Sequence, residues 1–187
     1  MENFSFQESE KRILLALSPS RSYRENNLQM IRKILAKGDM RVIILCVNQP
    51  SAFLLDLYAR NGIDTTRIFF IDAITQYATG MVTENIANCR FVSKPNDLTA
   101  MGIAVTTTLK KFEGGNNVIL FDSVNAMLIH SSTMDVTKFI HFVISKIRIL
   151  DIAGILLAVE KGLDPVLLSQ LTMFADDLVE FQEVPAG

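Results

Sequence analysis

NVILFD, residues 117–122, is the stretch that decides the fold. Four apolar residues stand in an unbroken run between an asparagine and an aspartate. A strand with one face in water alternates apolar and polar residues, whereas an unbroken apolar run is typical of a strand buried on both faces of a parallel sheet. The stretch therefore predicts a sheet that is covered by helices on both sides.

Six further strand-like runs occur along the chain. They are RILLAL (12–17), RVIILCV (41–47), RIFFID (67–72), CRFVS (89–93), AGILLAV (153–159) and DLVEF (177–181), of which the last is mixed in polarity and suits a sheet edge. Helical patterns alternate with these runs, which favours strand–helix–strand units with right-handed crossovers. We expect an α/β fold in three layers, doubly wound around a mostly parallel sheet of about six or seven strands.

Capping residues predict where the helices between these strands begin and end. Ser22 and Glu25 fit an S-x-x-E capping box at the start of a helix that runs to Lys37 and stops at Gly38. Other expected starts are the proline at 50, the cap-forming residues 96 or 97, and the aspartate at 164 that precedes a proline. Between residues 133 and 150, apolar positions 136, 139, 140, 143, 144 and 147 form a stripe that should lie on the sheet. Segment 73–88 has weak periodicity and is expected to be a mobile loop or an insertion.

Length and composition indicate one domain, residues 1–187, with a large core and a flexible N-terminus over residues 1–10. Hydrophobic residues make up 49% of the chain and charged residues 20%, and the mean hydropathy is +0.29. The most apolar segment, residues 139–159, contains His141, Lys146, Arg148 and Asp151, which argues against a membrane span. The apolar excess leads us to expect a protein partner or self-association, most simply a homodimer.

The distribution of charge, cysteine and histidine argues against a nucleic-acid-binding protein, a secreted protein and a metal site. The net charge is −2 and the basic residues are scattered, so no nucleic-acid partner is expected. The start of the chain is polar and acidic, unlike a secretory signal. Cys46 and Cys89 lie far apart and are expected to be buried free thiols in a reducing cytoplasm. His130 and His141 show no metal-ligand spacing.

Three carboxylates follow predicted strands and are candidates for a site. In parallel α/β sheets, ligands bind beyond the carboxyl ends of the strands, where Asp72, Asp122 and Glu160 should meet at one edge. An aspartate at the end of an apolar strand, as in VILFD, resembles a Walker B strand, whose carboxylate holds a hydrated Mg²⁺ beside nucleotide phosphates. The alternative interpretation is that Asp122 caps the helix that starts near Ser123.

Three segments together resemble the RecA-like ATPase domain of the KaiC type over nearly the whole chain. They are residues 14–64, 118–130 and 153–181, with Lys37-Gly38 after a helix, NQP at 48–50, GID at 62–64, DS at 122–123 and AD at 175–176 as anchors. The resemblance is closest to small, mainly archaeal KaiC-like proteins, and it implies a RecA-like P-loop NTPase fold.

The chain departs from that family at two positions needed for ATP hydrolysis. Active members carry G-x-x-x-x-G-K-[ST] after the first strand, because glycines let backbone N–H groups wrap the phosphates and lysine neutralises them. Residues 18–25 read SPSRSYRE, without glycine or lysine, and Pro19 lacks an N–H. The family's catalytic glutamate follows the second strand, where this chain has the neutral amides Asn48 and Gln49, which cannot accept a proton.

We therefore expect a non-catalytic regulatory or protein-interaction module with an eroded nucleotide site, no catalytic residue and no cofactor. The vestigial site comprises Ser20, Arg21, Ser22, Arg24 and Asp122. The arginines are expected to be solvated, with modest anion affinity at the helix N-terminus as the alternative. Three alternatives stay open: an ATPase that binds ATP and Mg²⁺ through an atypical loop with Asp122 as metal ligand, a site completed between subunits, and a domain that dimerises with an active homologue and tunes it.

Overall fold

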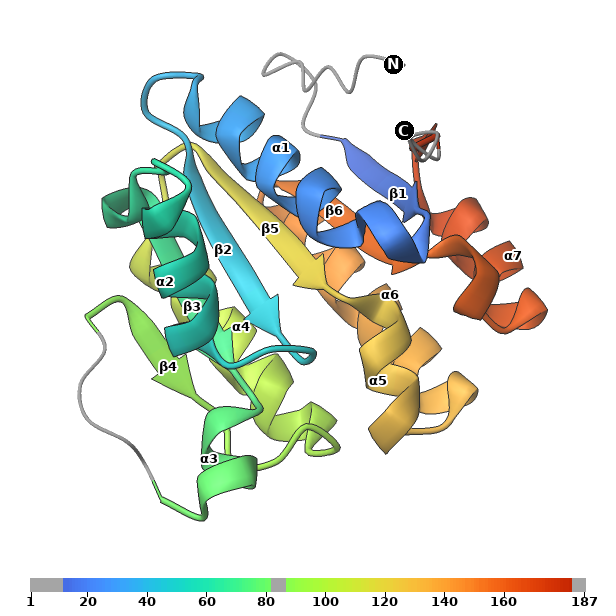
Figure 1. Ribbon diagram of the computed structural model, residues 1–187. Helices are drawn as coiled ribbons and strands as arrows, with labels where there is room; N and C mark the ends of the chain where they lie inside the picture. Colours follow the sequence, from blue (N-terminus) through green and yellow to red (C-terminus); the bar gives the residue numbers. More distant parts are fainter. Residues whose placement is uncertain (1–11, 82–86, 183–187) are drawn as a thin grey trace.

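A computed structural model describes residues 12–81 and 87–182, so the predicted flexible N-terminus lies outside the described residues. Seven strands form one sheet in the order β4-β3-β2-β5-β6-β1-β7, and every pairing is parallel (Figure 1). The strands are β1 (Ile13–Ser18), β2 (Arg41–Cys46), β3 (Ile68–Asp72), β4 (Cys89–Phe91), β5 (Asn117–Asp122), β6 (Ala153–Val159) and β7 (Asp177–Glu180). The predicted parallel α/β sheet is confirmed, and the mixed final run forms an edge strand.

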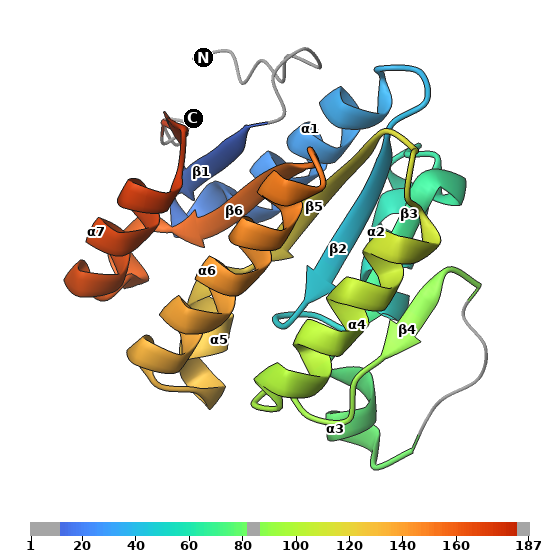
Figure 2. The ribbon, with the colours of Figure 1, turned by 180° about the vertical axis from the view of Figure 1, so that it is seen from behind.

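Helices cover both faces of the sheet and complete the three layers. One face carries α1 (Tyr23–Leu35) and α2 (Ser51–Arg60), which stand in front of the sheet in Figure 1. The other face, turned forward in Figure 2, carries α4 (Leu98–Lys111), α5 (Val124–His130), α6 (Thr133–Ile149) and α7 (Pro165–Phe174). The short helix α3 (Thr75–Thr79) follows β3, and three 3-10 turns complete the list: η1 (Ser20–Ser22), η2 (Thr65–Arg67) and η3 (Glu160–Gly162).

Strand β5 shows why its sequence is apolar without alternation. Val118 and Leu120 belong to the core beneath α1 and α2, whereas Ile119 and Phe121 belong to the core beneath α4, α5, α6 and α7. All four side chains are fully buried. Successive side chains of a strand point to opposite faces. A strand between two helical layers therefore needs apolar residues at consecutive positions and not only at every second one.

Several predicted helix boundaries are confirmed. Asp97 caps α4 by accepting a hydrogen bond from the Ala100 N–H, and Asp164 caps α7, with Pro165 in its first turn. The six apolar positions of the stripe between residues 133 and 150 are all buried on α6. No helix among residues 12–81 and 87–182 is both long enough and apolar enough to cross a bilayer.

Other expectations about local structure are wrong. The capping box does not form, because Ser22 makes no capping hydrogen bond to α1 and its hydroxyl instead accepts from the side chain of Asn26 at 3.2 Å. Helix α1 ends at Leu35, two residues before the expected Lys37, and the turn at Gly38 has φ +64°, a conformation that favours glycine. Segment 73–88, expected to be a mobile loop or an insertion, contains α3 and is therefore not a loop throughout; residues 82–86 lie outside the described residues.

Candidate functional site

A cavity of about 490 Å³ opens between α1 and α2 at the carboxyl end of the sheet. Four of the five residues of the predicted vestigial site line it: Ser20, Arg21, Arg24 and Asp122. Ser22 does not line the cavity. The turn after β1, the turn after β2 and the end of β5 therefore meet at one place.

Asp122 forms the floor of this cavity and is bound to Tyr23. Its side chain is 1% exposed, and the Tyr23 hydroxyl donates a hydrogen bond to its Oδ1 atom. Burial raises the pKa of Asp122 from 3.8 to about 6, although the bond from Tyr23 partly opposes the rise. The pKa of Tyr23 is raised well above 10.0 by its own burial and by Asp122, so the phenol remains a donor. The alternative that Asp122 caps α5 is not the observed arrangement, because its hydrogen-bond partner is Tyr23.

Hydrogen bonds within the turn between β1 and α1 join its residues to one another. The Asn26 amide donates to the Ser18 hydroxyl at 2.9 Å as well as to Ser22, and the Ser22 N–H donates to the carbonyl of Pro19 at 3.2 Å. No residue of this turn has a positive φ. A phosphate cradle needs free backbone N–H groups in a glycine-permitted conformation, so this turn offers no cradle.

Asp72 holds a separate structural position at the same edge. It is fully buried at the end of β3 and accepts hydrogen bonds from the N–H of Ser51 (2.7 Å), Ile74 (2.8 Å) and Thr75 (2.8 Å) and from the Thr75 hydroxyl (2.6 Å). These bonds join the start of α2 to the start of α3. Asp72 therefore stabilises two helix starts and does not line the cavity of Asp122.

The three carboxylates that were expected to meet share the sheet edge but line no common cavity. Cys46 pairs in register with Asp72 on one side and with Asp122 on the other. Since neighbouring strands are spaced about 4.8 Å apart, the Cα atoms of the two aspartates lie about 10 Å apart across β2. Glu160 is exposed on η3 and does not line the cavity of Asp122. Burial, followed by Asp72 and Asp122, raises the pKa of the Cys46 thiol well above 9.0, which makes it inert.

Asn27 and Tyr58 join α1 to α2 beneath the cavity. The Tyr58 hydroxyl donates to the Asn27 Oδ1 atom at 3.0 Å, and both side chains are buried. Burial first, and then the charge of Asp122, raises the pKa of Tyr58 well above 10.0. The Nδ2 atom of Asn27 has no hydrogen-bond partner, although Asn27 lines the cavity and is 3% exposed.

The rim of the cavity is polar and charged. Arg21 and Arg24 are exposed, and neither side chain makes a hydrogen bond or an ion pair with another described residue. Asn48 and Gln49 line the rim from the turn after β2. The exposure of both arginines fits the expectation that they are solvated, and it also leaves them accessible to a partner.

Magnesium is not a good fit to this cavity. Mg²⁺ requires several oxygen ligands in octahedral geometry, whereas Asp122 is the one carboxylate on the buried floor and it is bound to Tyr23. Within residues 12–81 and 87–182, no group of three or more histidine, cysteine, aspartate or glutamate side chains could hold a metal ion. Both cysteines are free: Cys46 is buried, as expected, whereas Cys89 is only half-buried.

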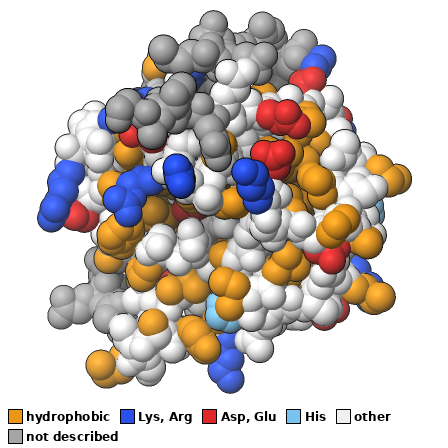
Figure 3. All heavy atoms as spheres, turned by 45° about the vertical axis from the view of Figure 1, so that its right-hand side comes forward, with side chains coloured by type: hydrophobic (Ala, Val, Ile, Leu, Met, Phe, Trp, Pro, Cys, Tyr) orange, Lys and Arg blue, Asp and Glu red, His pale blue; other side chains and the backbone are white. Residues whose placement is uncertain are grey.

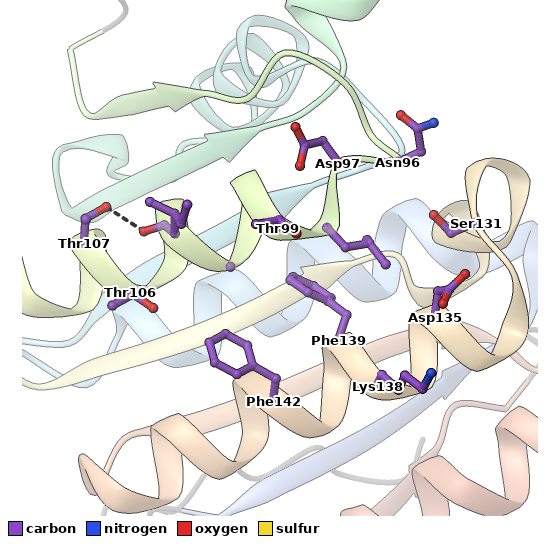
Figure 4. A pocket seen from close by; sticks show the side chains of 13 residues that line it. Asn96, Asp97, Thr99, Thr106, Thr107, Ser131, Asp135, Lys138, Phe139 and Phe142 are labelled. Atoms are coloured by element: carbon purple, nitrogen blue, oxygen red, sulfur yellow. Dashed lines mark hydrogen bonds between the residues drawn. The ribbon is translucent and has the colours of Figure 1, made fainter.

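A second concave surface lies on the opposite face of the sheet, between α4 and α6. This groove has a volume of about 700 Å³. Figure 4 shows Phe139 and Phe142 of α6 facing α4, with Asp97 and Asp135 near one end. Phe142 remains 44% exposed and Ile103 of α4 remains 57% exposed. An apolar surface of this kind suits contact with another protein better than catalysis.

Sequence reasoning missed Tyr23, Asn27 and Tyr58. The hydrogen-bond partners of the two tyrosines lie on other elements. One signal was available: Tyr23 and Asn27 are four residues apart, so they share the face of α1 that also buries Ile31 and Ile34. A polar pair on a buried helix face indicates a hydrogen-bonded network beneath it.

Comparisons with known proteins add a family and a fold. The model of a family of unknown function (DUF7504) matches residues 15–181. None of the curated proteins matches the chain significantly. Among solved structures, an uncharacterized protein, PH0321 from Pyrococcus horikoshii, in complex with an unknown peptide, is similar with a TM-score of 0.66 and 15% identity over 91% of this chain and 77% of that one. At this identity the likeness concerns the fold.

Proposed function

The chain belongs to DUF7504, a family of unknown function, and we propose that it is a non-catalytic regulatory or protein-interaction module built on a RecA/KaiC-like fold with an eroded nucleotide site. The bond from Tyr23 to Asp122 is the observation that carries this proposal. It occupies the carboxylate that would otherwise hold a hydrated metal ion, in a cavity whose neighbouring turn has no phosphate cradle.

Two further observations support the loss of catalysis. A general base must accept the proton of the attacking water, and the turn after β2 presents Asn48 and Gln49 to the cavity. Arg24 is exposed at the rim rather than held over a phosphate-binding turn. The free thiols fit the reducing cytoplasm that we propose as its location.

Phosphate release from ATP tests this proposal. With Mg²⁺ present, the purified protein is expected to release phosphate at the rate of a protein-free blank, because neither a metal ligand nor a base is available. A rate that saturates with ATP, rises in proportion to protein and disappears in the Asp122→Asn variant would contradict the proposal. Such a result would favour the alternative, an ATPase with an atypical loop.

Light scattering with and without ATP separates the other alternative, a site completed between subunits. An arginine supplied in trans would contact nucleotide held between protomers, and nucleotide held there would favour their assembly. We expect the same mass with and without ATP. An ATP-dependent increase in mass would favour the shared-site enzyme.

Self-association is proposed on the apolar surface of the helices behind the sheet. Exposed large hydrophobic side chains recur on α4, α6 and α7: Ile103, Met134, Phe142, Ile149, Val166 and Met173. Figure 3, which turns the side bearing α7 toward the viewer, shows hydrophobic side chains in small groups among neutral ones. The similar solved fold in complex with a peptide is compatible with a protein-binding role for this chain.

Charge introduced on the α4–α6 surface is expected to weaken a homodimer. We predict that sedimentation of the wild-type chain gives twice the 20.9 kDa mass of one chain, and that Ile103→Lys with Phe142→Lys weakens the dimer at least about tenfold, since burying unpaired lysines is costly. Ile129→Lys, on α5, is the matched control and should leave the mass unchanged. A wild-type monomer at micromolar concentration would remove the homodimer from the proposal.

A further inference from the structure

We propose that the cavity between α1 and α2 binds an extended segment of a partner protein in which an apolar residue is flanked by acidic residues. The inference rests on the proposed interaction role and names the surface and the chemistry of the partner. It is carried by an unpaired donor on the cavity floor, unpaired cations on the rim and an apolar wall between them.

The floor presents a buried donor without an acceptor. Tyr58 fixes the Oδ1 atom of Asn27, which leaves the Nδ2 group of the same amide without a partner in a side chain that is 97% buried. Leaving a buried donor unpaired costs free energy, whereas an acceptor brought by a ligand removes that cost. A carbonyl oxygen of a peptide main chain is an acceptor of the right kind.

The carboxylate of Asp122 disfavours a negatively charged ligand group on the floor of the cavity. Its carboxylate lies on the same floor, and an anion beside it would raise the cost of burying both charges. A neutral carbonyl meets no such repulsion. The part of the ligand that reaches Asn27 is therefore neutral, which disfavours a phosphate or a free carboxylate as the buried group.

The rim of the cavity, in contrast, favours negatively charged groups of the ligand. Arg21 and Arg24 are both exposed and unpaired among the described residues. Glu25, the one carboxylate on the rim, lies 3.9 Å from Arg32, which partly offsets its charge. Guanidinium groups bind carboxylates in a bidentate geometry. Acidic side chains that flank the buried carbonyl can therefore reach the arginines while staying in water.

The wall of α2 supplies the apolar contact. Phe53, Leu54 and Leu57 line the cavity, and Phe53 is 43% exposed. A volume of about 490 Å³ is within the range of pockets that bind compact ligands and holds a few residues of an extended chain. An apolar side chain between two acidic ones would pack on this wall.

Fluorescence anisotropy with short labelled peptides tests the inference. The probes are acetylated, amidated tripeptides with leucine, phenylalanine, methionine or valine between two glutamates, and the same set with lysines in place of the glutamates. At least one acidic peptide is expected to saturate below about 1 mM, with weaker binding as salt rises, and its lysine counterpart should bind at least about tenfold more weakly.

Variants test whether the peptide binds in this cavity, and they distinguish the contribution of the two rim arginines from that of Asn27. Arg21→Ala with Arg24→Ala should weaken the acidic peptide at least about tenfold, whereas Arg90→Ala with Lys94→Ala, which removes the same charge from exposed positions that do not line the cavity, should leave it unchanged. Asn27→Ala should weaken binding without changing its salt dependence.

Three results would overturn the inference: no acidic peptide saturates, the acidic and basic peptides bind alike, or both charge variants weaken binding equally. Free glutamate that competes as strongly as the whole peptide would also overturn it, because the site would then recognise a small carboxylate. Phosphate release from ATP is measured separately, so absence of peptide binding with no ATP turnover removes this inference and leaves the proposed loss of catalysis intact.

Discussion

Replacing Asp72 by alanine is expected to lower the free energy of unfolding by about 3–5 kcal/mol. The substitution removes the acceptor of four hydrogen bonds and leaves the N–H groups of Ser51, Ile74 and Thr75 without their partner. These donors start α2 and α3, and a buried donor that loses a charged acceptor pays the full cost of its desolvation. Urea unfolding followed by circular dichroism measures the change.

Asp64→Ala is the matched control for that experiment. Asp64 accepts from the N–H and the hydroxyl of Thr66 in the same way, but at an exposed position. Water can replace an exposed cap, so the expected loss is much smaller than at Asp72. Equal losses at Asp72 and Asp64 would show that burial of the Asp72 network adds nothing, contrary to its assigned role.

Replacing Asp122 by asparagine is expected to stabilise the protein at pH 8 and to have little effect near pH 4.5. The pKa of Asp122 rises from 3.8 to about 6 on folding, so the folded state binds the proton more tightly and stability falls as pH rises through the window between these values. A tenfold change in proton affinity corresponds to about 1.4 kcal/mol, so the ionised side chain costs the folded state about 3 kcal/mol above pH 6. Asparagine keeps an acceptor for Tyr23 but buries an additional N–H, so we expect a net gain of about 1–2 kcal/mol at pH 8.

The pH dependence of this difference is the informative measurement. Unfolding is measured at both pH values for the wild type, Asp122→Asn and the exposed control Asp56→Asn, so that contributions from other titrating groups cancel within each pair. The control should not reproduce the gain in stability that Asp122→Asn shows at pH 8. A loss of stability in Asp122→Asn at pH 8 would contradict the assignment of a costly buried carboxylate.

The strands could be predicted from the sequence because a strand that is buried on both faces has an unbroken run of apolar residues, which is a local pattern. In β5, every residue between Asn117 and Asp122 is apolar, and the six buried positions of α6 follow the helical period. The chemistry of helix starts was also local where Asp97 and Asp164 bond to amides a few residues away. Such patterns need no knowledge of distant parts of the chain.

The contents of the site could be predicted only in part, because its deciding contacts join distant segments. Tyr23 and Asp122 are 99 positions apart, and Tyr58 and Asn27 are 31 apart. Ser22 shows how a competing local contact can override a motif: its S-x-x-E pattern is present, but its hydroxyl accepts from the side chain of Asn26, four residues further along the chain. A capping box competes with every other donor that the fold brings near.

Titration of the wild-type protein with ATP in excess Mg²⁺, followed by calorimetry, tests most directly the central claim that the nucleotide site is closed. Because Tyr23 occupies Asp122 and the turn of residues 18–25 provides no cradle, we predict no saturable heat of binding up to about 1 mM ATP. Saturation at micromolar ATP that requires Mg²⁺ and is lost in Asp122→Asn would contradict the claim, because it would show that the carboxylate leaves Tyr23 to hold a metal–nucleotide complex.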